Sequence, residues 1–244
     1  MTTPLDPVPG PPAKSKGDLV TRTLSAIVMV AVAGTALWLG GWVFTAFVVA
    51  VGLGVLWEWW GLVQRIAKTP LGAALWMVAG VSYVGLGMAA LVGMRAAELA
   101  FALLPIVLVI AVDVGAYFAG RTIGGPKIAP AISPSKTWAG LGGGAFAALA
   151  TLYGAYQVGR IDLHHRDGSL MMDALPIWLA MSALALAIAI IAQSGDFFES
   201  WMKRRAGVKD SGSLIPGHGG LFDRVDGLLA VLFVGGLLWL VAGT

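Results

Sequence analysis

Long apolar runs with few charges determine what this chain can fold into, because each is close to the length that crosses a bilayer. Seven such runs occur within its 244 residues, and a membrane-spanning helix needs about 20 mainly apolar residues. A helix satisfies its own backbone hydrogen bonds, which hydrocarbon cannot do. We therefore predict an all-α, polytopic helical membrane protein with about seven transmembrane helices. The predicted spans are 22–39, 42–63, 71–92, 99–120, 138–158, 174–195 and 226–243.

The amino-acid composition agrees with a membrane protein. Hydrophobic residues make up 58% of the chain, more than an average soluble domain contains. Cysteine is absent, which excludes disulfides and thiol chemistry. Basic residues exceed acidic ones, 16 to 13, and we attribute this excess to cytoplasmic loops of a membrane protein rather than to nucleic-acid binding. We predict no nucleic-acid partner.

The chain divides into a short tail and one membrane domain. Residues 1–18 are polar and rich in proline, which predicts a disordered cytoplasmic tail. Residues 19–244 are predicted to form a single transmembrane catalytic domain. Gly40 and Gly41 separate the first two spans so closely that only a tight helical hairpin fits.

The positions of the basic residues predict the orientation in the membrane. With the N-terminus in the cytoplasm, 13 of the 16 lysines and arginines fall on the cytoplasmic side, as the positive-inside rule requires. The loops 121–137 and 196–226 then share that side.

One segment concentrates charge in a chain that is otherwise nearly free of it. Residues 193–227 hold ten of the 29 charged residues. Acids that suit a divalent cation stand there beside bases that suit phosphates, which predicts a phosphate-transferring site at a membrane surface. The ten are Asp196, Glu199, Lys203, Arg204, Arg205, Lys209, Asp210, Asp223, Arg224 and Asp226.

Two acidic pairs in this segment suggest a metal site. Asp196 and Glu199 are three residues apart, with Ser200 on the same helical face, and Asp223 and Asp226 repeat that spacing at the start of the last span. Mg²⁺ prefers a few carboxylates with water and phosphate oxygens. The alternative for Asp196 is a simple interfacial helix cap.

Glycines and bases complete the candidate site. His218 stands among glycines that include Gly219 and Gly220, and such a loop lets backbone N–H groups approach an anion. Lys209 beside Asp210 suits a phosphate with its metal. The run Lys203, Arg204 and Arg205 fits phosphate binding or membrane anchoring equally well.

Polar residues upstream offer further candidates. Asp113 lies within an apolar span, where an acid is costly and usually functional, although a hydrogen bond between helices is the alternative. Ser133 and Lys136 lie in a proline-rich loop at the membrane surface and could bind phosphates. Glu58, within Trp57-Glu58-Trp59-Trp60, belongs to an aromatic anchor or has a role of its own.

The run 200–226 closely resembles the signature of the bacterial phosphatidate cytidylyltransferases, also called CDP-diacylglycerol synthases. The matching pattern is S-x-x-K-R, K-D, P-G-H-G-G and D-R-x-D, and the upstream D-V-G-A-Y-F-A-G-R and S-P-S-K-T-W-A-G resemble two more family segments. Ser135 stands where the family usually has Lys, and Ala139 where it usually has Glu. These departures concern the 133–140 loop alone.

The resemblance implies an enzyme of the bacterial cytoplasmic (inner) membrane that joins CTP and phosphatidate to give CDP-diacylglycerol and pyrophosphate. It also implies Mg²⁺ as cofactor, held by Asp196 and Asp223. The expected partners are CTP, phosphatidate and membrane lipid, and a homodimer stays open. The expected catalytic residues are Asp196, Lys209, Asp210, His218, Asp223, Arg224 and Asp226, and the expected substrate-binding residues are Asp113, Ser133, Lys136, Ser200, Lys203, Arg204, Gly219 and Gly220.

Two other functions remain open from the residues. A CTP-dependent polyprenol or phytol kinase would share the chemistry but need a base for its alcohol acceptor, for which Asp113 could serve. A transporter would use the intramembrane acids as ion ligands. Its site is expected near the midplane of the membrane, often with internal repeats, whereas the acids here cluster toward one face and no repeat is evident.

Overall fold

Helices account for most of the chain that the structure describes, residues 16–164, 174–215 and 219–242 of a computed structural model. The predicted helical class is confirmed, with one small β-hairpin added. In chain order the elements are α1 (Lys16–Leu39), α2 (Gly41–Ile66), α3 (Pro70–Ala97), α4 (Leu99–Thr122), β1 (Lys127–Ala129), β2 (Ser133–Thr137), α5 (Trp138–His164), α6 (Ala174–Ala206) and α7 (Phe222–Ala242).

Five helices in the described residues are long and apolar enough to cross a membrane: α2, α3, α4, α6 from Ile177 onward, and α7. The apolar part of α1, Thr23–Leu39, is shorter. α5, which is rich in Gly and Ala, is not among these five. Large apolar side chains such as Val30, Trp42 and Leu71 are exposed, as expected of surfaces that face lipid. The membrane class is thus confirmed, with five candidate spans among the described residues.

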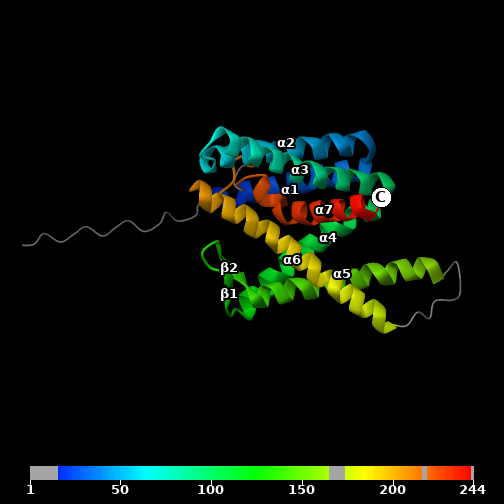
Figure 1. The fold of residues 1–244 in the computed structure, drawn as a ribbon. Helices are drawn as coiled ribbons and strands as arrows, with labels where there is room; N and C mark the ends of the chain where they lie inside the picture. Colours follow the sequence, from blue (N-terminus) through cyan, green and yellow to red (C-terminus); the bar gives the residue numbers. More distant parts are fainter. Residues whose placement is uncertain (1–15, 165–173, 216–218, 243–244) are drawn as a thin grey trace, which may run out of the picture.

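The helices form two groups that α6 connects. Figure 1 shows α1, α2, α3 and α7 running side by side, while α6 crosses obliquely from this group to α4 and α5. One buried apolar cluster, which includes Trp59, Met202 and Phe222, joins α2 and α3 to α6 and α7. A second cluster, which includes Val112 and Ala189, joins α4, α5 and α6. α6 therefore contributes to both cores.

The third and fourth helices are continuous, although glycines and a proline stand within them. In α3, an added Cβ at Gly80 would meet the indole of Trp59 at 2.5 Å, and one at Gly87 would meet a methyl of Leu229 at 2.7 Å. These glycines thus make room for large neighbours and do not break the helix. α4 runs through Pro105 without ending, which membrane helices tolerate.

The turn between α1 and α2 is as tight as predicted. Gly40 and Gly41 have φ angles of 65° and 51°, a region that favours glycine. Arg95, at the end of α3, donates from Nε to the carbonyl of Leu37 at 2.7 Å and from its guanidinium to that of Trp38 at 3.0 Å. A helix ends with unpaired carbonyls, so Arg95 caps α1 from another helix.

The proline-rich loop between α4 and α5 forms an antiparallel hairpin of β1 and β2. Lys127 pairs with Thr137 and Ala129 with Ser133. The prolines disfavour helix, which agrees with the extended strands. Pairing of the two strands was not foreseen, and it corrects the purely α-helical prediction.

Several predicted element ends differ from the structure. The predicted tail 1–18 lies mostly outside the described residues, but α1 begins at Lys16, since no proline follows Pro12 in this region. The sixth span was predicted to end at 195, yet α6 continues to Ala206. Basic residues in its last turn favour the helical C-terminus. α7 begins at Phe222, four residues before the predicted span.

Candidate active site

A polar cavity of about 790 Å³ opens beside the β-hairpin, between α4, α6 and the start of α7. Its lining contains seven basic and six acidic side chains together with several hydroxyls. Eleven of the fifteen predicted site residues line it, and these are Asp113, Lys136, Asp196, Ser200, Lys203, Arg204, Lys209, Asp210, Asp223, Arg224 and Asp226. The structure therefore brings residues from 113 to 226 to one place.

Asp223, in the first turn of α7, is the most fully hydrogen-bonded acid of the cavity. Its Oδ2 accepts from the backbone N–H and the hydroxyl of Ser211, both at 3.0 Å, and from the N–H of Gly220 at 2.9 Å. Its Oδ1 accepts from Nζ of Lys203 at 2.5 Å. Asp223 thus fastens the 207–221 loop to α7 while it faces the cavity.

Lys203 bridges two acids. Its Nζ lies 2.5 Å from Oε2 of Glu199, one turn earlier in α6, and 2.5 Å from Oδ1 of Asp223 in α7. Glu199 is only 1% exposed, and its other oxygen, Oε1, has no hydrogen-bond partner in the described structure. A buried carboxylate is costly unless it is paired, so Lys203 is needed where it lies.

The β-hairpin positions Lys136 next to Asp196, the other predicted metal ligand. Lys136 of β2 forms an ion pair with Oδ2 of Asp196 in α6. The hydroxyl of Ser200, one turn later, lies 3.5 Å from Oδ1 of Asp196. Both side chains of the ion pair are partly exposed, so a substrate phosphate can reach Lys136.

Close helix packing places Asp226 beside Asp196. An added Cβ at Gly195 would meet the carbonyl oxygen of Asp226 at 2.5 Å and Cβ of Ala230 at 2.7 Å. The backbones of α6 and α7 are therefore nearest to each other next to these acids. Asp226 interacts electrostatically with Asp196, Asp113 and Lys136. The sequence offers no sign of this contact beyond the glycine itself.

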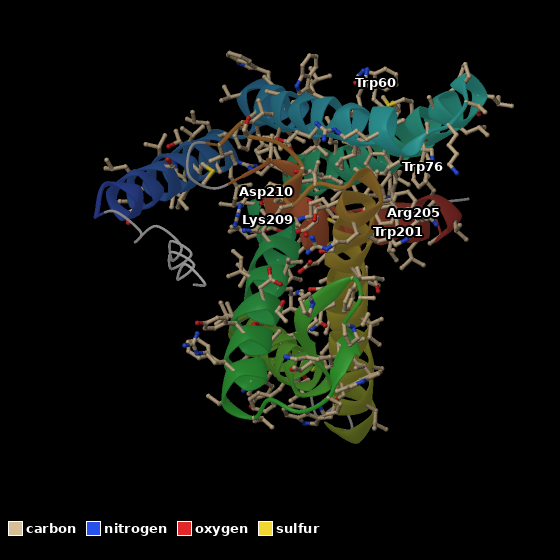
Figure 2. All side chains as sticks on the ribbon, turned by 90° about the vertical axis from the view of Figure 1, so that its left-hand side faces the viewer. Trp60, Trp76, Trp201, Arg205, Lys209 and Asp210 are labelled. Atoms are coloured by element: carbon tan, nitrogen blue, oxygen red, sulfur yellow. The ribbon has the colours of Figure 1, made fainter. Side chains whose placement is uncertain are left out.

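The basic run at the end of α6 divides between two surfaces. Lys203 and Arg204 line the cavity, whereas the guanidinium of Arg205 lies over the ring of Trp201, 5.3 Å from its centroid. Figure 2 shows Arg205 and Trp201 together on one side, and Lys209 with Asp210 on the other. Two bases of the run therefore face the cavity, and Arg205 does not line it.

Ser133 is not part of the lining. It is buried, 8% exposed, and its hydroxyl lies 3.5 Å from that of Ser135. Ser135, at the first departure from the family segment, does line the cavity. Arg204 reaches the hairpin as well, with Nε 3.5 Å from the carbonyl of Ile132.

In the glycine loop, a backbone N–H binds a carboxylate of the protein itself. The N–H of Gly220 donates to Asp223, and the carbonyl of Gly219 accepts from Ile215 at 3.2 Å. Gly219 and Gly220 do not line the cavity in the described structure, and Gly220 binds a carboxylate of the protein itself. His218 lies outside the described residues.

Glu58 of α2 is the residue whose importance the sequence left most open. It is 3% exposed, and its carboxylate accepts three hydrogen bonds: from N–H of Leu221 at 2.9 Å, from N–H of Phe222 at 2.8 Å and from the hydroxyl of Ser211 at 2.9 Å. Glu58 does not line the cavity; it holds the loop that carries Lys209 and the start of α7. A lone acid in an apolar helix was the signal that pointed to it.

A family model described as the cytidylyltransferase family matches residues 67–241. This stretch contains every described residue that lines the cavity. The chain belongs to the cytidylyltransferase family.

Curated relatives agree with this membership. The chain is 36% identical over 261 residues to a phosphatidate cytidylyltransferase of Brucella suis, covering 87% of this chain and 90% of the relative. It is 31% identical over 233 residues to one of Rickettsia bellii, covering 92% and 94%. A shorter match, 42% identical over 127 residues, links 52% of this chain to 41% of a Haemophilus influenzae protein of the same name. The resemblance inferred from the sequence motifs is confirmed.

The carboxylate oxygens that line the cavity are ligands of the kind that Mg²⁺ prefers. Among the residues that the structure describes, no three His, Asp or Glu side chains gather closely enough to hold a metal ion on their own. Mg²⁺ commonly takes only one or two carboxylates and completes its shell with phosphate and water. Asp196 and Asp223, the two predicted ligands, line the cavity together with Asp226, and Oε1 of the buried Glu199 has no partner within the described residues. The residues therefore fit the ion without forming a preassembled cage.

Proposed function

We propose that this chain is a phosphatidate cytidylyltransferase, which joins CTP and phosphatidate to give CDP-diacylglycerol and pyrophosphate. The observation that carries the proposal is the single cavity, at one end of membrane helices, that seven bases and six acids line. Family membership and the names of the relatives support the same activity. A charged nucleotide can enter such a cavity from water while a lipid headgroup enters from the membrane.

The proposed reaction needs no strong base in the protein. An oxygen of the phosphatidate phosphate attacks the α-phosphorus of CTP, the bond from that phosphorus to the bridging oxygen breaks, and pyrophosphate leaves. The attacking phosphate is already anionic near neutral pH. Positioning and neutralisation of charge therefore supply most of the catalysis.

The bases of the cavity have distinct positions for this task. We assign Lys209 of the loop before α7 and Arg224 of the first turn of α7 to the triphosphate, together with Lys136 of β2. Lys203 and Arg204 of α6 lie on the same cavity and complete the binding of phosphate. Lysine and arginine are both good phosphate ligands, and arginine can bind two oxygens at once.

Magnesium is the proposed cofactor, held by Asp196 and Asp223 with Asp226 beside them. When bound, it would neutralise the charge that develops on the transferred phosphate. Lys136 and Lys203 pair with these two acids, and Lys203 also neutralises the buried Glu199. Glu199 and Asp113 remain additional acids of the same cavity, and Asp210 lies beside Lys209.

The proposed setting is the cytoplasmic (inner) membrane of a bacterium, with the N-terminus and the cavity on the cytoplasmic side. We propose seven crossings, so that the hairpin, which follows four helices, and the loop before α7, which follows six, share the side of the N-terminus. Membrane lipid and a second copy of the chain are proposed partners. Cross-linking in intact membranes would test the homodimer.

Purified protein in lipid micelles, supplied with labelled CTP, Mg²⁺ and phosphatidate, tests the proposal. We expect labelled CDP-diacylglycerol and one equivalent of pyrophosphate. A parallel reaction with a polyprenol in place of phosphatidate tests the kinase alternative. Product from the polyprenol and none from phosphatidate would show that the acceptor is an alcohol, and no product from either would show that the proposed function is wrong.

A further inference from the structure

Gln193 of α6 is a buried amide without a partner. Its side chain lines the polar cavity, and the residue is only 4% exposed. Neither Nε2 nor Oε1 has a hydrogen-bond partner within the described part of the chain. An amide buried in this way costs free energy, and native proteins rarely leave both atoms unpaired. A ligand that enters the cavity would offset that cost.

The position of Gln193 along α6 indicates which part of a ligand could reach it. Asp196, Ser200, Lys203 and Arg204, which line the same cavity, all lie closer to the C-terminal end of the helix. Since a helix rises about 1.5 Å per residue, they stand roughly 4–16 Å nearer to the hairpin end than Gln193 does. Gln193 follows Ala189 and Ala192 of the apolar core, so it marks the boundary between that core and the charged region.

A diacyl lipid has the same order of groups. Its phosphate is outermost, its glycerol ester groups come next, and its acyl chains lie deepest. If the phosphate meets the bases near Asp196, the ester carbonyls reach the depth of Gln193. An ester carbonyl only accepts hydrogen bonds, and Nε2 of an amide donates two.

We infer that Gln193 binds an ester carbonyl oxygen of the lipid substrate and makes the enzyme selective for diacyl over dialkyl lipids. This inference rests on the proposed function and adds to it the part of the lipid that is recognised. Cytosine, which offers a donor and an acceptor, is the competing ligand. The depth of Gln193 below the phosphate-binding bases favours the lipid.

The test compares dioleoyl phosphatidate with its diether analogue, which has the same chains but no carbonyls, in wild type and in Gln193→Leu. We expect the wild type to have a KM about three- to ten-fold lower for the diester, the range of one hydrogen bond. In Gln193→Leu the two KM values should become equal, and the KM for CTP should not change. Ser194→Ala is the matched control, because Ser194 is the exposed neighbour whose hydroxyl bonds to the carbonyl of Ile190.

Thermal unfolding separates recognition from a structural role. Without substrate, Gln193→Leu should unfold at the same temperature as wild type or higher, since it removes an unpaired buried amide. The diester should raise the unfolding temperature of wild type more than that of the variant. A clear loss of stability without substrate would instead show a structural amide and overturn the inference.

Further outcomes would contradict the inference, and those measured on the wild type hold even if the variant does not fold. Equal KM values for diester and diether in the wild type would exclude ester recognition. A rise in the KM for CTP in Gln193→Leu, with the lipid KM unchanged, would assign Gln193 to the nucleotide base. A wild type inactive on both lipids would refute the proposed function itself, which is a distinguishable result.

Discussion

Glu58 of α2 accepts a hydrogen bond from the backbone N–H of Phe222 in α7 at 2.8 Å, across 164 residues of sequence. The same carboxylate binds Leu221 and Ser211, and Ser211 in turn binds Asp223. A helix outside the cavity therefore positions the loop and the acid that face it.

We predict that Glu58→Gln impairs both turnover and stability. The NH₂ group that this substitution introduces would face backbone N–H groups that need an acceptor. One unsatisfied buried donor costs about 1–3 kcal/mol of stability. In a chain of this size that lowers the unfolding temperature by roughly 2–10 °C. Turnover should fall about ten-fold or more, and a protease should cut the 207–221 loop faster. The control is Glu98→Gln, because Glu98 is an exposed acid that directly follows α3. Normal kinetics and unchanged proteolysis in Glu58→Gln would show that Glu58 does not position the loop.

Asp196→Asn and Asp223→Asn should each lower turnover by at least about two orders of magnitude, the usual effect of lost transition-state electrostatics. The two variants should differ in stability. Asp223 accepts hydrogen bonds from Ser211, Gly220 and Lys203, so its replacement should also lower the unfolding temperature. Asp196 is partly exposed, so its replacement should change the unfolding temperature little. Kinetics and thermal unfolding of the purified variants measure both effects. Near-normal turnover of either variant in Mg²⁺ would refute the metal assignment.

Lys209→Gln should affect CTP kinetics more than Arg205→Gln does. Lys209 lines the cavity, and losing a charge-assisted contact of about 1.5–3 kcal/mol should raise the KM for CTP, lower kcat, or both, by about ten-fold or more. Arg205 lies over Trp201 and serves as the matched control. CTP kinetics at equal membrane abundance are the decisive measurement. Equal, small effects of both substitutions would leave Lys209 as a membrane anchor.

The two ends of α3 should lie on opposite sides of the membrane. Lys68 precedes α3 and Glu98 follows it, and both are exposed. With 13 of 16 basic residues on the predicted cytoplasmic side, Glu98→Cys should react with an impermeant thiol reagent added to intact cells, and Lys68→Cys should not. The chain has no native cysteine, so the background is clean. Labelling of Lys68→Cys from outside would reverse the orientation and move the cavity away from cytoplasmic CTP.

Motif spacing predicted most of the residues that meet in the cavity. The i, i+3 and i+4 spacing of Asp196, Glu199 and Ser200 requires only a continuous helix, and α6 supplies it. Spacing could not predict the hairpin pairing that brings Lys136 to Asp196. That contact joins residues 60 positions apart, and it depends on how α4, α5 and α6 pack together.

Local chemistry in the sequence by itself determined the membrane class, the charged segment and the family, because apolar length, charge and motif spacing are properties of neighbouring residues. The tertiary structure alone decided which partner each charge has. It directs Lys203 to two acids and Arg205 to Trp201, although both stand in one basic run. It also ties Glu58 to Phe222 and leaves Gln193 unpaired. The physical reason is that a helical pattern defines the faces of a helix, whereas the packing of other helices decides what each face meets.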